Sequence, residues 1–286
     1  MSLLPLRPNV RGMEQEAQRT VLQFYADAGV ETVEGEMPGG IWNWQVSAPA
    51  PRPEPKPSAP SRQPAALAQA RPEASIDEAI AAAEAAAASA DTLDALITAI
   101  TAFEGCPLRS GATQPVIFDG VLGADVLVVG EAPGREEDRL GKPFVGKSGQ
   151  LLDRMLASIG LARAPNSDQA PVCITNAAYW RPPGNRNPTK AELATCMPFA
   201  KRFVALSQPK LVLLAGKVPT EAFFPDVSSI IRARGQFRSL ECGADGATVP
   251  ALPLFHPAFL LRQPAQKRWA WRDLLAAKAK LKEQTA

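Results

Sequence analysis

The sequence contains one histidine and four cysteines, and both scarcities limit the chemistry that the protein can support. The cysteines, at positions 106, 173, 196 and 242, include no CxxC pair. This spacing favours free thiols in a reducing compartment over a disulfide framework. The only candidate for a histidine-dependent step is His256.

Long apolar runs and a large net charge are also missing. No stretch approaches the roughly 18 apolar residues of a membrane span, and the first residues, MSLLPLRPNVRGMEQEAQR, lack the apolar core of a signal peptide. We therefore expect a cytoplasmic protein with no membrane partner. The net charge of +2 does not by itself favour a polyanionic partner, so a nucleic-acid surface would have to be a local patch.

Composition divides the chain into four parts. Residues 1–46 include a helical pattern, and residues 47–74 have the proline density of an extended linker. Residues 75–104 are an alanine-rich helical lead-in, where Ser75 and Glu78 predict a capping box. Residues 105–286 form the catalytic-looking domain.

Short apolar strands alternate with helices in this last part, which predicts an α/β domain with a parallel sheet covered on both faces. The predicted strands are Val116–Phe118, Val126–Val129, Val172–Thr175, Leu211–Leu214 and Leu252–Phe255. The predicted helices are Gly149–Ile159, Lys190–Ala205, Pro219–Phe224 and Ala265–Lys282, and a hairpin is predicted from Arg234–Leu240 and Ala247–Ala251. Ligands of such sheets bind beyond the carboxyl ends of the strands.

The segment GKPFVGKS, Gly141–Ser148, matches the phosphate-loop pattern G-x-x-x-x-G-K-[ST]. A working phosphate loop follows directly from a strand, but here about ten residues separate the preceding strand from the loop. Pro143 removes a backbone donor, and Phe144 is large where phosphate must approach. Nucleotide hydrolysis is therefore the less favoured alternative.

A longer set of motifs contains this segment. In order, GEAPG, ED, GKPFVG-x-SG-x-LL, ITN and HPAFLLR resemble family 4 of the uracil-DNA glycosylase superfamily from about Phe103 to Lys282. The resemblance implies a three-layer sandwich with a central, mostly parallel four-stranded sheet. It also implies a monomeric repair enzyme that hydrolyses the N-glycosidic bond of uracil, or of other deaminated bases, in single- or double-stranded DNA.

The resemblance assigns roles to residues at the predicted strand ends. Phe144 stacks on the flipped base, and the Asn176 amide pairs with the uracil edge. His256 stabilises the charge that develops on uracil O2. Ala132 is expected to contact the base through its backbone. It stands where other superfamily members place an aspartate, so the water-positioning group is left to Glu131 first and Glu137 second. Asp138 is a third nearby carboxylate, for which a structural role is as well supported as a catalytic one.

Further residues are candidates for contacts with DNA. HPAFLLR resembles an intercalation loop, in which an apolar wedge replaces the flipped base and basic residues hold phosphates. The candidates are Leu260, Leu261 and Arg262 in this loop, Arg181 and Arg186 in the loop RPPGNRNP, and Lys147 and Ser148 at a helix start.

One departure from the family concerns metal. Family 4 enzymes usually hold a four-iron four-sulfur cluster with four cysteines, but only Cys106 and Cys196 match here, and Phe103 and Trp180 stand at the other two positions. Two thiolates cannot hold such a cluster, so we expect no metal and no cofactor. The loss leaves a catalytically weak DNA-binding module of the same fold as an alternative function.

Overall fold

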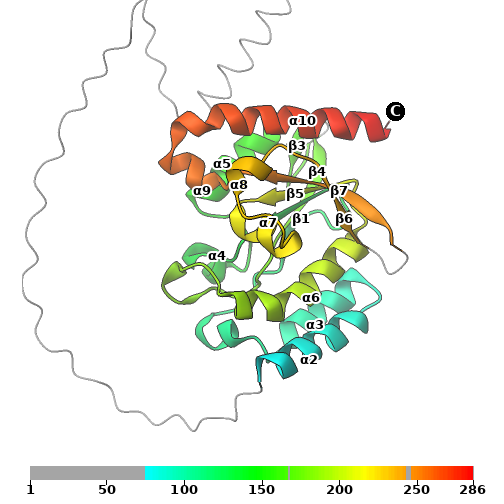
Figure 1. Ribbon diagram of the computed structural model, residues 1–286, viewed down its shortest axis with the longest axis vertical. Helices are drawn as coiled ribbons and strands as arrows, with labels where there is room; N and C mark the ends of the chain where they lie inside the picture. Colours follow the sequence, from blue (N-terminus) through cyan, green and yellow to red (C-terminus); the bar gives the residue numbers. More distant parts are fainter. Residues whose placement is uncertain (1–74, 167, 243–245, 286) are drawn as a thin grey trace, which may run out of the picture. The chain divides into compact units, whose positions relative to one another are not determined.

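The computed structural model describes residues 75–166, 168–242 and 246–285, which are built around one mixed sheet (Figure 1). The sheet has seven strands, in the order β1-β4-β2-β5-β7-β6, with β3 paired to β4 off this path. The strands are β1 (Phe118–Gly120), β2 (Val126–Gly130), β3 (Leu161–Ala162), β4 (Ala170–Asn176), β5 (Leu211–Ala215), β6 (Arg238–Glu241) and β7 (Thr248–Leu254). The predicted segments 1–46 and 47–74 lie outside the described residues.

The four central strands, β4, β2, β5 and β7, run parallel, which confirms the predicted sheet. β1 and β6 add antiparallel edges to it. The prediction separated Ala247–Ala251 from Leu252–Phe255, but residues 248–254 form one strand. Its first half pairs with β6 and its second half with β5, so both predicted pieces belong to one extended segment.

Side chains alternate between two cores along each central strand, as the period of two requires. Leu127 and Val129 of β2 face one core, whereas Val126 and Val128 face the other. The strands are therefore apolar on both faces, which explains why the sequence shows continuous apolar runs rather than alternation.

Helices cover the two faces (Figure 1). The first core is closed by α2 (Ile76–Ala88), α3 (Leu93–Ala102), α6 (Lys190–Ser207) and α7 (Lys217–Phe223). The second core is closed by α5 (Lys147–Ala157), α9 (Pro257–Arg262) and α10 (Lys267–Thr285). The remaining short helices are α4 (Arg135–Leu140), α8 (Ile230–Ala233), η1 (Pro107–Gly111), η2 (Pro183–Asn185) and η3 (Pro264–Gln266). The result is a three-layer sandwich, as predicted.

Local capping agrees with the sequence. Ser75 and Glu78 form the predicted capping box of α2, and the Thr92 side chain caps α3. In the described part of the chain, no helix combines the length and the apolar character needed to cross a bilayer.

The phosphate-loop match does not have the geometry of a phosphate loop. α4 lies between the end of β2 at Gly130 and the segment Gly141–Ser148. β5 ends at Ala215 and is followed by Gly216 and Lys217, so no acid follows this strand to hold magnesium. Residues 141–146 instead form the loop between α4 and α5, and Lys147 and Ser148 begin α5.

Candidate active site

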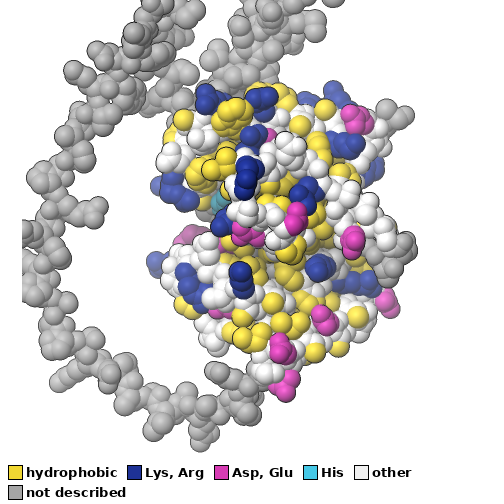
Figure 2. All heavy atoms as spheres, in the orientation of Figure 1, with side chains coloured by type: hydrophobic (Ala, Val, Ile, Leu, Met, Phe, Trp, Pro, Cys, Tyr) yellow, Lys and Arg dark blue, Asp and Glu magenta, His cyan; other side chains and the backbone are white. Residues whose placement is uncertain are grey.

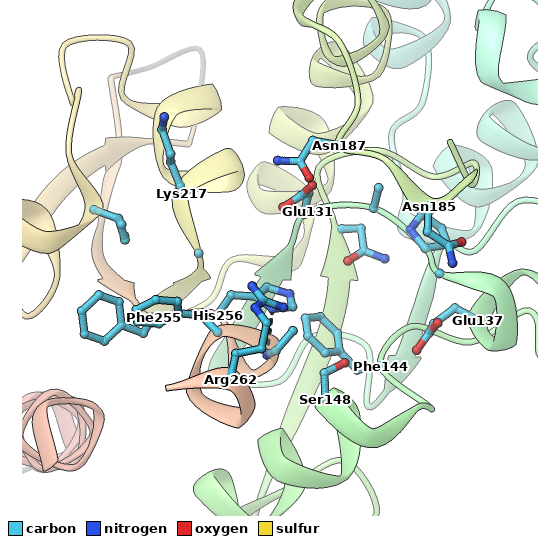
Figure 3. A pocket seen from close by; sticks show the side chains of 18 of the residues that line it. Glu131, Glu137, Phe144, Ser148, Asn185, Asn187, Lys217, Phe255, His256 and Arg262 are labelled. Atoms are coloured by element: carbon cyan, nitrogen blue, oxygen red, sulfur yellow. Dashed lines mark hydrogen bonds between the residues drawn. The ribbon is translucent and has the colours of Figure 1, made fainter. Parts of the chain in front are cut away.

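A cavity of about 500 Å³ lies at the carboxyl ends of the parallel strands (Figure 3). This is the edge at which ligands of such sheets bind. The side chains that matter most for its chemistry are Glu131, Phe144, Asn176, Asn187, His256 and Arg262. Ala132, Glu137, Ser148 and Arg186 also line it, so the cavity brings together most of the residues chosen from the sequence.

Phe144 is held in this cavity by an unusual backbone. Its φ angle of 54° is in the left-handed region, which a side chain of this size rarely adopts. Arg163 donates hydrogen bonds to the carbonyl oxygens of Pro143 (2.9 Å) and Phe144 (3.0 Å). A side chain at Gly149 would overlap the Phe144 carbonyl group, so glycine is required there. The loop is therefore fixed in the conformation that directs the ring into the cavity.

The rings of Phe144 and His256 stack beside each other in the lining of the cavity, with centroids 5.6 Å apart and planes 28° apart (Figure 3). A planar ligand whose edge meets His256 would therefore lie close to parallel with Phe144. One ring can stack on a base while the other contacts its edge.

His256 has its tautomer set by the helix that follows it. Its Nδ1 accepts a hydrogen bond from the Ala258 N–H (3.1 Å) and caps α9. Burial, with a smaller contribution from Arg262, lowers the pKa of His256 to about 4. The ring is therefore neutral at pH 7, and because Nδ1 is an acceptor, Nε2 carries the proton.

Asn176 ends β4 and is 2% exposed. Within the described ranges, no residue forms a hydrogen bond with its side-chain amide. Its backbone is opposite Gly130 of β2, where an added Cβ would overlap both the Asn176 amide oxygen and the Phe144 ring. The wall of the cavity therefore needs glycine at position 130.

The two candidate water-positioning carboxylates have different environments. Burial raises the pKa of Glu131, and no described residue donates a hydrogen bond to its carboxylate. Glu137 instead accepts hydrogen bonds at Oε1 from the backbone N–H groups of Val145 and Gly146, each 3.0 Å long. Glu131 is thus available to a ligand, whereas Glu137 holds the loop that carries Phe144.

Asp138 takes the structural role that the sequence left open. It is 4% exposed and accepts hydrogen bonds from the backbone N–H (2.8 Å) and hydroxyl (2.9 Å) of Thr113. It does not line the cavity.

The candidates for contacts with DNA separate into three groups. Leu260 is fully buried in the second core, so it cannot act as the predicted wedge, whereas Leu261 is 39% exposed. Arg181 binds Asn185, and Arg186 binds both carboxylate oxygens of Glu192 at 2.7 and 2.8 Å. Arg262 and Ser148 line the cavity, and Lys147 is exposed beside it at the start of α5.

Comparison with known proteins assigns this chain to a family. The model of the "Uracil DNA glycosylase superfamily" matches residues 118–277. The chain belongs to the uracil-DNA glycosylase superfamily.

Curated relatives place it near one branch of that superfamily. It is 35% identical over 178 residues to the type-4 uracil-DNA glycosylase of Archaeoglobus fulgidus, covering 61% of this chain and 85% of the relative. The type-4 enzyme of Sulfurisphaera tokodaii is 35% identical, covering 61% and 78% of the two chains. That of Thermotoga maritima is 34% identical, covering 63% and 89%. The resemblance to family 4 is thereby confirmed.

Phe103, Cys106, Trp180 and Cys196 stand at the positions that match the iron-sulfur ligands of family 4. Their side chains do not fit a four-iron cluster. The sulfur atoms of Cys106 and Cys196 lie 3.7 Å apart in the core. The ring of Phe103 packs 6.4 Å from that of Trp180 and 5.0 Å from that of Phe199. Carbon rings cannot ligate iron, and no group of three or more potential ligands occurs among the described residues.

Sequence reasoning placed Gly130 at a strand end of the site but did not predict that glycine is required there; it missed Arg163, and it gave Glu137 a different role from the one that its hydrogen bonds indicate. It also missed Asn185 and Asn187, which line the cavity, although both stand in the quoted loop RPPGNRNP. The only available signal was their polarity next to Arg186. Contacts made across the fold, such as those of Arg163, leave no local pattern in a single sequence.

Proposed function

We propose that the protein is a DNA repair glycosylase that hydrolyses the bond between uracil and deoxyribose and leaves an abasic site. The observation that carries this proposal is the near-parallel pair of Phe144 and the neutral His256. Type-4 uracil-DNA glycosylases are also the curated relatives reported above.

The cavity suits a base that has been rotated out of the DNA stack. The Phe144 face offers base stacking, which typically contributes about 1–3 kcal/mol per base. The Asn176 amide supplies one acceptor and two donors, so it can pair with N3–H and O4 of uracil. Cytosine presents an amino group and an unprotonated N3 to the same edge, so it mismatches this amide.

Bond cleavage leaves the electron pair of the C–N bond on the uracil ring, mainly at O2. The Nε2–H of His256 is a fixed donor that strengthens as this charge grows, and so it favours the transition state over the bound substrate. A neutral imidazole serves this purpose without giving up its proton.

Water must then add to the sugar carbon that the base leaves. Glu131 is the carboxylate available to orient this water and to stabilise the positive charge on the sugar. Its raised pKa makes it a better base for the proton that the water loses. We therefore propose Glu131 for this role and Glu137 as the residue that positions the Phe144 loop.

The proposed DNA contacts are made by candidate side chains that are at least partly exposed to solvent around the cavity. We propose that Leu261 fills the gap left by the flipped base and that Arg262, Lys147 and Ser148 bind nearby phosphates. Arg181 and Arg186 contact DNA in this proposal from the loop on the other side of the cavity. We further propose that the enzyme acts as a monomer, without a metal cluster, in the cytoplasm, on uracil and on other deaminated bases, in single or double strands.

The test is incubation with uracil-containing DNA followed by alkali cleavage of abasic sites. Wild-type protein should cut the strand at uracil, and His256→Ala should lower the rate roughly 10²-fold, as the loss of one oxyanion-hole donor does. Lys201→Ala, a change on α6 outside the cavity, is the matched control. DNA binding without cleavage by the wild-type protein would favour the inactive DNA-binding module instead.

A further inference from the structure

Three arginines surround one tryptophan beside the cavity. The guanidinium carbons of Arg234, Arg268 and Arg272 lie 5.4, 5.2 and 5.2 Å from the centre of a Trp269 ring. Arg268, Trp269 and Arg272 belong to the first turns of α10, and Arg234 follows α8. Cation–π contacts of this kind restrain arginine side chains that would otherwise be mobile.

We call Arg234, Arg268 and Arg272 the arginine cluster. Of these three residues, Arg234 also contacts the cavity wall. Its guanidinium lies 5.6 Å from the centre of the Phe255 ring, and Phe255 lines the cavity next to His256. It also donates a hydrogen bond to the Trp269 carbonyl oxygen (3.1 Å) and forms an ion pair with the buried Asp273. Because Asp273 neutralises Arg234, the charge that the cluster presents to solvent comes from Arg268 and Arg272.

Positive charge is concentrated in this part of the chain. Residues 257–285 contain seven Lys or Arg and two acidic residues, while the whole chain has a net charge of only +2. Arg268 and Arg272 are exposed, and neither forms an ion pair with a carboxylate in the part of the chain that the structure describes. In Figure 2, Lys and Arg side chains lie over the end of the molecule formed by α8, α9 and α10, with few acidic side chains between them.

We propose that Arg268 and Arg272, held by Trp269, bind the phosphates of the DNA strand that continues away from the flipped nucleotide. The inference rests on the proposed glycosylase function and extends its DNA contacts from the cavity rim at Arg262 onto α10. The two arginines are four residues apart and so lie roughly 6 Å apart along one helix face. Guanidinium groups bind phosphate through two hydrogen bonds, and side chains already ordered on an indole lose less entropy when they do so.

The proposal is tested with two uracil-containing single strands, one too short to reach α10 and one several times longer. Wild-type protein should show a kcat/KM roughly 10-fold higher on the long strand at low salt, because the extra phosphates add salt-dependent contacts. The double variant Arg268→Ala/Arg272→Ala should lose most of this preference. For this variant on the long strand, the slope of log kcat/KM against log salt concentration should be shallower than that of the wild type by about 1.4. This is roughly 0.7 for each of the two lost phosphate contacts.

Two further variants separate the lost charge from any loss of folding. Arg268→Lys/Arg272→Lys keeps both charges and should retain most of the salt slope, whereas Lys201→Ala removes a distant charge and should match the wild type. If the wild type cuts both strands and the alanine double variant shows the same length preference and salt slope, the phosphate role of α10 is wrong while the glycosylase function stands. If the wild type cuts neither strand, the glycosylase function fails and this inference fails with it.

Discussion

Arg163 donates a hydrogen bond from Nη2 to the carbonyl oxygen of Phe144, 3.0 Å away. The same guanidinium binds the carboxylates of Asp119 (2.9 Å) and Asp153 (2.8 Å), which fix its orientation. Phe144 has a left-handed backbone, and such a conformation persists only where neighbouring contacts enforce it. Arg163 therefore links the half-buried Asp119 and the exposed Asp153 to the loop whose Phe144 ring lines the cavity.

Arg163→Ala should release this loop and reduce the ordering of Phe144. We expect uracil excision to fall roughly 10-fold, mainly through KM, because misplacement of a positioning group weakens binding of the reacting base. We also expect a loss of about 2 kcal/mol in the free energy of unfolding, the scale of hydrogen bonds to charged groups. Steady-state kinetics and thermal unfolding measure the two effects.

Arg139→Ala is the matched control for Arg163. The Arg139 side chain is exposed and contacts Glu136, and its backbone carbonyl, which accepts a hydrogen bond from Gln114, remains in the variant, so excision should stay unchanged. Arg163→Lys should recover little, because an ammonium cannot reproduce the forked contacts. Equal KM values for wild type and Arg163→Ala would show that the loop holds its conformation without Arg163.

Glu131→Gln should lower kcat by about 10²-fold while leaving KM nearly unchanged, because in the proposed mechanism the carboxylate acts on water and sugar rather than on the base. In the wild type, activity should fall as the pH drops through the pKa of Glu131, which burial raises above its usual value. In the variant, the remaining activity should persist to lower pH and fall near pH 4, where His256 gains a proton. A pH–rate profile that is the same in both proteins would exclude Glu131 as the ionising group.

Gly130→Ala should reduce excision at least about 10²-fold, because the added methyl group overlaps both Asn176 and Phe144 and either shift misplaces the base. Gly123→Ala offers a control of comparable chemical size. A Cβ at Gly123 meets open space, but its φ of 72° is strained for alanine, so stability should fall by about 1 kcal/mol while excision persists. Single-turnover rates and denaturant unfolding of both variants separate these effects.

Protein purified without oxygen should contain less than one iron per chain and show no broad visible absorbance, because Phe103 and Trp180 cannot ligate iron. Cys106→Ser should keep excision within about threefold of wild type, since Cys106 and Cys196 lie in the core and not in the cavity. Iron analysis and an absorbance spectrum decide the question. Four irons per chain would require ligands other than Cys106 and Cys196 to complete the cluster site.

The sequence was sufficient for features with a local pattern. Continuous apolar runs such as Val126–Val129 located the parallel strands, and the polar residues after them, Asn176 and His256, were placed correctly at one edge of the sheet. The choice of the residue that inserts into DNA shows what a local pattern cannot predict. Leu260 and Leu261 are adjacent and chemically alike, and only the packing of α9 against α5 and the sheet buries the first and exposes the second.

Residues whose function depends on distant partners could not be predicted in this way. Arg163 meets Phe144 nineteen positions earlier in the chain, and Glu137 binds backbone N–H groups eight and nine positions away. Gly130 is constrained by Asn176 on a neighbouring strand. In each case the chemical requirement arises from the fold, because no spacing within a single element brings the groups together.

The hydrogen bond by which His256 caps α9 links the proposed base-binding ring to the helix that carries Leu261. The nitrogen that accepts from Ala258 keeps the ring in one tautomer, and the same hydrogen bond anchors the first turn of the helix that presents Leu261. A ring flip or a change of tautomer would break this hydrogen bond and loosen the start of the helix. In the proposed mechanism, base recognition by His256 and insertion of Leu261 into DNA therefore depend on the same hydrogen bond, and a substitution of His256 should impair both.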